Sequence, residues 1–232
     1  MGYGSTVSDR SALYLLAGVI CAGAVGCELI IGPSWAINRA LDEISEAGIQ
    51  DKAEGTDLQF RFVSRTMEVE GDEATVFARG EASGFLQGVR TECICVEAIP
   101  FVRAEGGWSV DGFPLARLAA VSAALDARHK AFENRDVDAY RALAHADYGD
   151  DPDSLRDLRA RLETVLADVG DEPVRQEILA RTMRVERNEA IVTERWRLSF
   201  GEDDAGEEAV EGRARYVLVP TDDGWRFTSG LM

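Results

Sequence analysis

The stretch "RTMEVEGDEATVFARG", residues 65–80, decides the fold, because a close copy, "RTMRVERNEAIVTERW", stands at residues 181–196. The two copies share the opening Arg-Thr-Met, a Val-Glu pair and a later Glu-Ala pair without a gap. Each copy is typical of a strand, a tight turn and a second strand. The offset between the copies is 116 residues, and the offset between Trp108 and Trp225 is 117. A nearly constant offset indicates that a folded unit has been duplicated.

The segments around each copy follow one plan, in which helical periodicity is followed by four strands. The first copy has one predicted helix, at 34–48, and predicted strands at 57–70, 73–85, 89–103 and 106–113. The second has predicted helices at 118–134, 136–148 and 150–170, and strands at 172–186, 189–200, 209–220 and 222–230. We therefore predict an α+β fold of two tandem units, residues 34–114 and residues 115–232, each with its helices packed on a curved four-stranded antiparallel meander.

Three segments carry a resemblance to a known family. The stretch "AFENRDVDAYRALAHADYGDD", 131–151, resembles the helical opening of NTF2-like domains, and "EGGWSVDGF", 105–113, and "DDGWRFTSG", 222–230, resemble their final strand. The resemblance implies a strongly bent antiparallel sheet that wraps its helices around a cone-shaped cavity. The first unit, with a single helix, is similar to the smaller cystatin-like form of this fold.

The N-terminus is typical of a secretory signal, because a short charged region precedes an apolar run and small residues. The sequence "AVGC", 24–27, resembles the bacterial lipoprotein cleavage box, which implies a signal peptide at 1–26, lipidation of Cys27 and a short linker at 27–33. We expect a lipid-anchored protein of the cell envelope, with the periplasmic side of the outer membrane favoured because Glu28 follows the cysteine. The alternative is an uncleaved membrane anchor from about Ala12 to Ile31.

Composition excludes several classes of function. The net charge of −17 argues against binding nucleic acid or anionic lipid headgroups, both of which need clustered lysine and arginine. We expect no metal, because the chain has two histidines, and Cys93 and Cys95 are typical of small buried residues. Motifs for phosphate loops and nucleophile turns are missing from the sequence, so we also expect no cofactor. The acidic stretch "GEDDAGEE", 201–208, is typical of a solvated hairpin tip.

Several residues of the second unit are expected to face its cavity. Glu194 shares a strand face with Trp196, and His129 lies on the apolar face of its helix, between Leu125 and Phe132. The predicted ligand pocket comprises His129, Tyr140, Glu194, Trp196 and Tyr216.

The family resemblance implies an alternative role for three of these residues. SnoaL-like and ketosteroid isomerase-like enzymes use carboxylate, tyrosine or histidine groups inside the cone. Here Glu194 could serve as a general base, with Tyr216 stabilising an oxyanion and His129 beside them. The other interpretation is that Glu194 reaches solvent or pairs with an arginine. The counterpart of Glu194 in the first unit is Ala78, which weakens the enzyme hypothesis.

We therefore predict a binding or assembly module without a catalytic role, which binds a small apolar ligand in its second cone or a protein partner on a sheet face. One alternative is an isomerase or hydratase that uses Glu194, and another is a structural spacer with filled cavities. We further expect the two units to pack face to face as an intramolecular pseudo-dimer.

Overall fold

The computed structural model of the chain describes residues 32–51, 55–105, 107–112, 114–149, 154–168, 174–200 and 209–231. The predicted signal peptide, the lipidation site Cys27 and the acidic stretch 201–208 lie outside these residues. Among the described residues, no helix has the length and apolar character needed to cross a membrane.

Four helices and nine strands are described. The helices are α2 (Pro33–Ala47), α3 (Ala116–Glu133), α4 (Val137–Ala142) and α5 (Ser154–Asp168). The strands of the N-terminal half are β1 (Ile49–Asp51), β2 (Thr56–Glu70), β3 (Glu73–Leu86), β4 (Val89–Ala104) and β5 (Gly107–Val110). The strands of the C-terminal half are β6 (Val174–Val185), β7 (Ala190–Phe200), β8 (Val210–Thr221) and β9 (Gly224–Ser229). We use N-terminal half for the chain up to β5 and C-terminal half for the chain from α3 onward.

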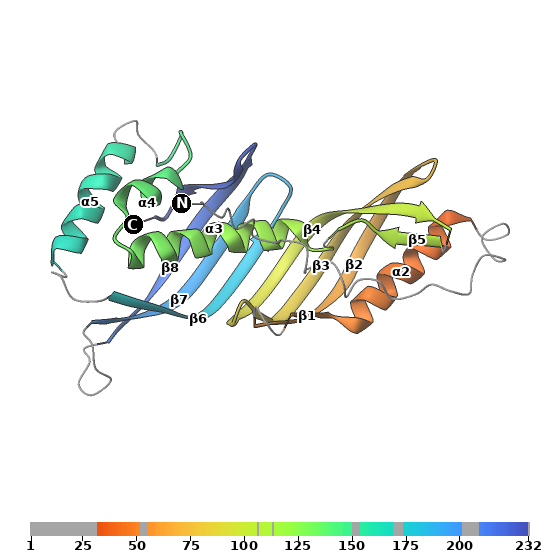
Figure 1. Cartoon of the computed structure of the whole chain (residues 1–232), viewed down its shortest axis with the longest axis horizontal. Helices are drawn as coiled ribbons and strands as arrows, with labels where there is room; N and C mark the ends of the chain where they lie inside the picture. Colours follow the sequence, from red (N-terminus) through yellow and green to blue (C-terminus); the bar gives the residue numbers. More distant parts are fainter. Residues whose placement is uncertain are drawn as a thin grey trace, which may run out of the picture.

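All nine strands belong to one continuous sheet, with the order β1-β2-β3-β4-β6-β7-β8-β9 and with β5 paired to β4 (Figure 1). The two halves meet where β4 and β6 run parallel, with Thr91 opposite Arg181 and Cys95 opposite Val185. The α+β prediction is confirmed, but the expectation of two separate antiparallel sheets is corrected. The sheet is mixed, and the halves join edge to edge instead of packing face to face.

The length of β4 explains how the two halves join. Strand β4 has 16 residues, but β5 pairs only with residues 101–104 at its C-terminal end. The N-terminal part of the same edge would expose unpaired backbone N–H and C=O groups. Strand β6 pairs with that part, so both halves share the strand β4.

The repeated sequence produces the same hairpin twice. Met67 pairs with Val76 across β2 and β3, and Met183 pairs with Val192 across β6 and β7. Each hairpin also has a register shift at the equivalent position, between Phe62 and Ser64 in one and between Ile178 and Ala180 in the other. Because a bulge fixes register and bends a strand, the repeat specifies both the pairing and the curvature of the two hairpins.

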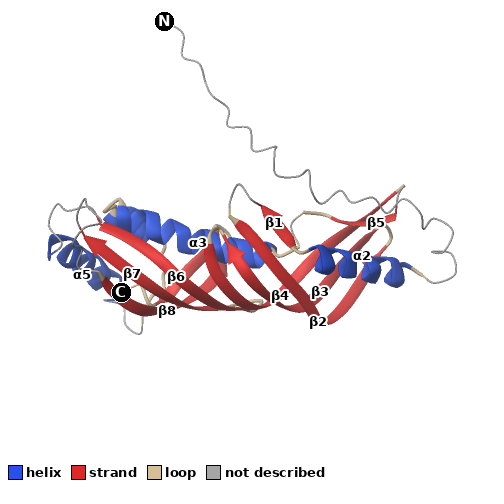
Figure 2. Cartoon of the chain, turned by 90° about the horizontal axis from the view of Figure 1, so that it is seen from below, coloured by secondary structure: helices blue, strands red, loops and turns tan. Residues whose placement is uncertain are grey.

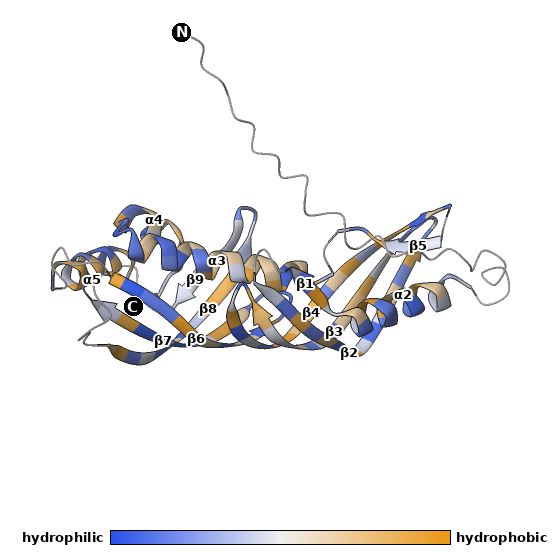
Figure 3. Cartoon of the chain, turned by 60° about the horizontal axis from the view of Figure 1, so that its bottom comes forward, coloured by the Kyte–Doolittle hydropathy of each residue, from blue (hydrophilic) through white to orange (hydrophobic). Residues whose placement is uncertain are grey.

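The helices lie along one face of the curved sheet (Figure 2). Hydrophobic and hydrophilic residues alternate along the strands (Figure 3), as expected for a sheet with one covered face. Helix α2 covers a small core that contains Ile37 and Trp108, whereas the core beneath α3 takes Phe60 from the N-terminal half and Tyr216 from the C-terminal half. Helix α3 is therefore packed on both halves.

Glu97 fixes the start of α3 on the sheet. Its carboxylate, which is buried on β4, accepts hydrogen bonds from the backbone N–H groups of Arg117 and Leu118, each at 3.0 Å. The first N–H groups of a helix have no partner within the helix. A carboxylate at this end also interacts favourably with the helix dipole. Strand β4 of the N-terminal half thus supplies the cap for the first helix of the C-terminal half.

Candidate functional site

A cluster of buried polar side chains lies between α3 and the strands of the C-terminal half. We call it the interior cluster and define it by seven residues: Ser122, Arg128, His129, Tyr140, Arg181, Glu194 and Tyr216. Helix α3 contributes three of them and the sheet three, so the cluster lies at the interface between the two layers. Glu194 reaches it because it lies on the same strand face as the buried Val192 of β7.

Both carboxylate oxygens of Glu194 have cationic or hydrogen-bonding partners. Arg181 donates from Nε to Oε1 at 2.8 Å, and Nε2 of His129 lies 3.0 Å from Oε2. Neither the Glu194 nor the Arg181 side chain is exposed to solvent. Glu194 therefore pairs with an arginine, as one of the two sequence-based interpretations held.

The hydrogen-bond chain continues from Arg181 into the N-terminal half. Arg181 donates from Nη1 to the hydroxyl of Ser122 at 3.0 Å, and Ser122 donates to Oε1 of Gln87 at 2.7 Å. A second carboxylate, that of Asp126 on α3, lies 3.7 Å from Nη2 of Arg181. The charge of Arg181 is thus balanced from two sides.

The pKa of Glu194 reflects two opposing effects. Burial raises the pKa of this carboxyl, but the hydrogen bonds and charges of His129 and Arg181 more than offset burial, so the pKa lies below its ordinary value. For Tyr216, burial raises the pKa, the charge of Arg128 opposes that rise, and the charge of Glu194 adds to it. Glu194 is therefore held as a carboxylate, and Tyr216 as a neutral phenol.

Arg128 lies over the ring of Tyr216. Its guanidinium carbon is 4.9 Å from the centre of the Tyr216 ring and 5.5 Å from that of Tyr140, which are cation–π distances. It donates from Nη1 to Oε1 of Gln176 at 3.3 Å, while its Nε is buried without a hydrogen-bond partner among the described residues. The Tyr140 hydroxyl donates to the carbonyl oxygen of Leu231, which fixes the ring.

The structure brings together four of the five predicted pocket residues: His129, Tyr140, Glu194 and Tyr216. The fifth, Trp196, packs against the backbone of β8, where a Cβ added to Gly212 would lie 2.3 Å from Trp196 Cζ2.

Two basic residues of the cluster were missed by sequence reasoning. The repeat held a signal for Arg181, because its counterpart Arg65 reaches Asp42 of the covering helix α2 at 2.9 Å. An arginine at this position in both copies predicts a contact between hairpin and helix. No comparable sequence signal identifies Arg128, which lies among the small and charged residues of α3.

The described residues contain no group of three or more histidine, cysteine, aspartate or glutamate side chains that could hold a metal ion. Cys93 and Cys95 are buried free thiols on β4. The hydrogen bond from Cys95 and burial both raise the pKa of Cys93, so that it remains a thiol. These cysteines therefore act in packing.

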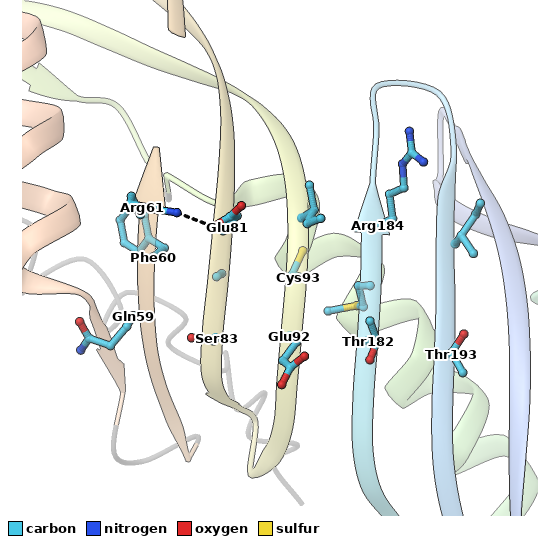
Figure 4. Close-up of a pocket in the computed structure, with 14 residues that line it drawn as sticks. Gln59, Phe60, Arg61, Glu81, Ser83, Glu92, Cys93, Thr182, Arg184 and Thr193 are labelled. Atoms are coloured by element: carbon cyan, nitrogen blue, oxygen red, sulfur yellow. Dashed lines mark hydrogen bonds and ion pairs between the residues drawn. The ribbon is translucent and has the colours of Figure 1, made fainter. Parts of the chain in front are cut away.

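A separate groove of about 630 Å³ crosses the junction of the two halves. Figure 4 shows its lining side chains on β2, β3, β4, β6 and β7, including Arg61 and Glu81, which form an ion pair at 2.8 Å. The lining combines polar side chains with apolar ones, such as Ile94 and Ile191. None of the lining residues belongs to the interior cluster, so groove and cluster are separate features.

The comparisons with known proteins point to one family. Residues 121–230 match the SnoaL-like domain. No protein of curated function matches the chain. The match to the SnoaL-like domain thus lies within the C-terminal half.

Several solved structures are similar to about half of the chain. Aln2 from a Streptomyces species is 10% identical, with a TM-score of 0.44 over 52% of this chain and 91% of its own. A protein of the NTF2-like family from Streptomyces avermitilis is 19% identical, with a TM-score of 0.38 over 50% of this chain and 95% of its own. The Kfla4162 protein from Kribbella flavida is 18% identical, with a TM-score of 0.40 over 50% of this chain and 88% of its own.

Proposed function

We propose that the chain, whose residues 121–230 match the SnoaL-like domain, is a binding module without a catalytic role. The observation that carries this proposal is the engagement of both Glu194 oxygens, by Arg181 and His129. A general base needs a free lone pair and a pKa near the working pH. The lowered pKa of Glu194 makes the carboxylate a weak base.

The proposed binding site is the interior of the C-terminal half, beside the interior cluster. Two observations support a ligand there: the Tyr216 hydroxyl and Arg128 Nε are both buried without hydrogen-bond partners among the described residues. Buried polar groups in native proteins are nearly always paired with protein, water or ligand. In a structural spacer with a filled interior, we would expect these two polar groups to be paired within the protein.

Binding can be tested with the neutral fluorescent probe N-phenyl-1-naphthylamine. We expect a saturable rise in its fluorescence with one site per chain, altered by Tyr216→Trp, which changes the shape of the interior. Thr182→Ala, in the groove across the junction, should leave the titration unchanged. No saturable signal would favour the spacer, and a signal altered only by Thr182→Ala would move the site to the groove.

A specific observation also favours the enzyme as a second candidate: His129 and Glu194 form a close pair at 3.0 Å beside a free tyrosine hydroxyl. A base in this position would exchange protons next to a carbonyl group. We expect no deuterium incorporation, measured by NMR in D₂O, when the protein is incubated with cyclohexenone. Incorporation by the wild type that is lost in folded Glu194→Gln would establish an isomerase-type enzyme instead.

We also propose that the protein is anchored in the cell envelope through a lipid on Cys27, which the sequence "AVGC" supports. The test is the intact mass of membrane-extracted protein, for the wild type and for Cys27→Ser. A mass that starts at Cys27 and carries an acyl modification, lost in the variant, is the expected result. An unprocessed chain in both would establish the uncleaved anchor.

A further inference from the structure

Arg128 is a buried cation without a carboxylate partner among the described residues. It is 8% exposed, and in this part of the chain its partners are the rings of Tyr140 and Tyr216 and the amide of Gln176. Taking a charge out of water is expensive unless an opposite charge compensates for it. Burial lowers the pKa of Arg128, but the two tyrosines and the more distant charge of Glu194 more than offset burial, so Arg128 stays charged without a direct ion pair.

The two carboxylates near the cluster form ion pairs with Arg181 instead of with Arg128. Glu194 and Asp126 both form ion pairs with Arg181, at 2.8 and 3.7 Å. The charge of Glu194 also acts on Arg128, although no ion pair joins the two side chains in the described part of the chain. Arg128 is therefore the arginine of the interior cluster that has no ion pair among the described residues.

The buried polar atoms of the interior cluster that lack hydrogen-bond partners among the described residues are all hydrogen-bond donors. Arg128 Nε, Arg181 Nη2 and Tyr216 Oη are buried and lack hydrogen-bond partners among the described residues. All three carry hydrogens that can be donated. What the site lacks, within the described residues, is a set of acceptors, and a carboxylate provides two oxygens that accept from an arginine fork or a hydroxyl.

We propose that the ligand of the interior site is a small organic monoanion, a carboxylate with an apolar body, which is held by Arg128 and Tyr216. This inference rests on the proposed function, because it requires that the interior take up a ligand. A carboxylate would give Arg128 the ion pair that it lacks among the described residues, whereas Glu194 would repel a dianion such as a phosphate ester more strongly than a monoanion. The apolar body of the ligand would lie against the rings of Phe132 and Tyr140, whose centres are 6.4 Å apart.

The test compares benzoate with its neutral analogue benzamide, by isothermal titration calorimetry with the full chain. We expect the wild type to bind benzoate at least tenfold more tightly than benzamide. Arg128→Met should abolish that preference, so that the two probes bind alike. Arg195→Met, which removes an exposed arginine from β7, is the matched control and should retain the wild-type preference.

Tyr216→Phe provides a second variant, which keeps the charge of Arg128 and removes only the hydroxyl. It should weaken benzoate binding several-fold and leave benzamide binding within twofold, and it supports or contradicts the proposal even if Arg128→Met does not fold. Equal binding of benzoate and benzamide by the wild type would overturn this inference and leave the binding module intact. Absence of binding by benzoate, benzamide and N-phenyl-1-naphthylamine together would overturn the binding module itself.

Discussion

Ser122, on α3, donates its hydroxyl hydrogen to the side-chain oxygen of Gln87, in the turn between β3 and β4, over a distance of 2.7 Å. Gln87 adopts a positive φ of 52°, a conformation that costs energy for a residue other than glycine. The same hydroxyl accepts from Arg181, which pairs with Glu194. A turn of the N-terminal half is thus tied through two hydrogen bonds to the buried ion pair of the C-terminal half.

The first prediction concerns cooperativity. Because β4 pairs with β6 and one core spans both halves, the chain should unfold in a single transition. Circular dichroism, tryptophan fluorescence and calorimetry should give the same midpoint. Two separate calorimetric transitions would show that the halves are independent domains, and a fragment of residues 115–232 would then fold alone. We expect that fragment to aggregate, because it exposes the edge of β6.

The sequence was sufficient for most elements of this fold, and for a physical reason. Alternation along β4 and the apolar periodicity of α3 are local, so both elements could be predicted within a few residues of their ends. The parallel pairing of β4 with β6 could not, because it depends on which part of a long edge β5 leaves free. The three-residue strand β1 is too short for a periodic signal and was missed.

The candidate site could also be predicted only in part from the sequence. Glu194 and Tyr216 were found because strand alternation shows which side chains face inward. The choice between a solvated and a paired Glu194 could not be made from sequence alone, because the partner Arg181 is 13 residues away and its side chain could have pointed to water. Arg128 was missed because a cation on a helix is usually exposed.

The second prediction concerns the buried ion pair. Glu194→Gln should lower the free energy of unfolding by about 3–5 kcal/mol at pH 7, because Arg181 would be buried without its closest carboxylate. The folded-state pKa of Glu194 is lowered, so its contribution is present above its ordinary value of 4.5 and lost as the pH falls. The difference between wild type and variant, measured by urea denaturation, should therefore shrink below about pH 4.5.

The double variant Arg181→Met/Glu194→Leu is the control for this prediction. Replacing both partners with apolar side chains removes the uncompensated charge, so the double variant should be more stable than Glu194→Gln. If the double variant is as unstable as Glu194→Gln, the loss of unfolding free energy comes from losing the ion pair itself and not from leaving Arg181 buried without a partner.

The third prediction compares the two buried arginines. Arg181→Met leaves Glu194 without its arginine and should cost about 3–5 kcal/mol. Arg128→Met removes a charge that has no carboxylate partner among the described residues but is held by two aromatic rings, so it should cost about 1–2 kcal/mol, less than Arg181→Met. Urea denaturation of both variants at pH 7 decides the matter. Equal losses would show that Arg128 has a compensating partner.

The fourth prediction concerns Trp196. Gly212→Ala would place a Cβ 2.3 Å from Trp196 Cζ2, so we expect a loss of about 1–3 kcal/mol and a shift in tryptophan fluorescence. Adding Trp196→Leu should restore most of the stability, because the smaller side chain leaves room for the methyl group. If the double variant is no more stable than Gly212→Ala, the clash is not with Trp196.

The last prediction concerns Glu97, whose titration has the opposite sign to that of Glu194. Burial raises the pKa of Glu97 above its ordinary value of 4.5, although the N–H groups of Arg117 and Leu118 and the charge of Arg117 partly offset that rise. The folded state then binds more protons than the unfolded state between these two pKa values, so stability falls as the pH rises through that window. Above the folded pKa both states are ionised and the loss is complete.

The side chain introduced by Glu97→Gln cannot titrate, so the stability of this variant should lack the decrease with rising pH that Glu97 causes in the wild type. Measured by urea denaturation from about pH 4.5 to 8, the free energy of unfolding of the wild type minus that of Glu97→Gln should decrease as the pH rises. Glu92→Gln, an exposed change on the same strand, should stay within about 0.5 kcal/mol of the wild type at pH 7. A difference between wild type and Glu97→Gln that instead grows with pH would mean that the two backbone hydrogen bonds outweigh burial, and that the carboxylate stabilises the start of α3 most when it is charged.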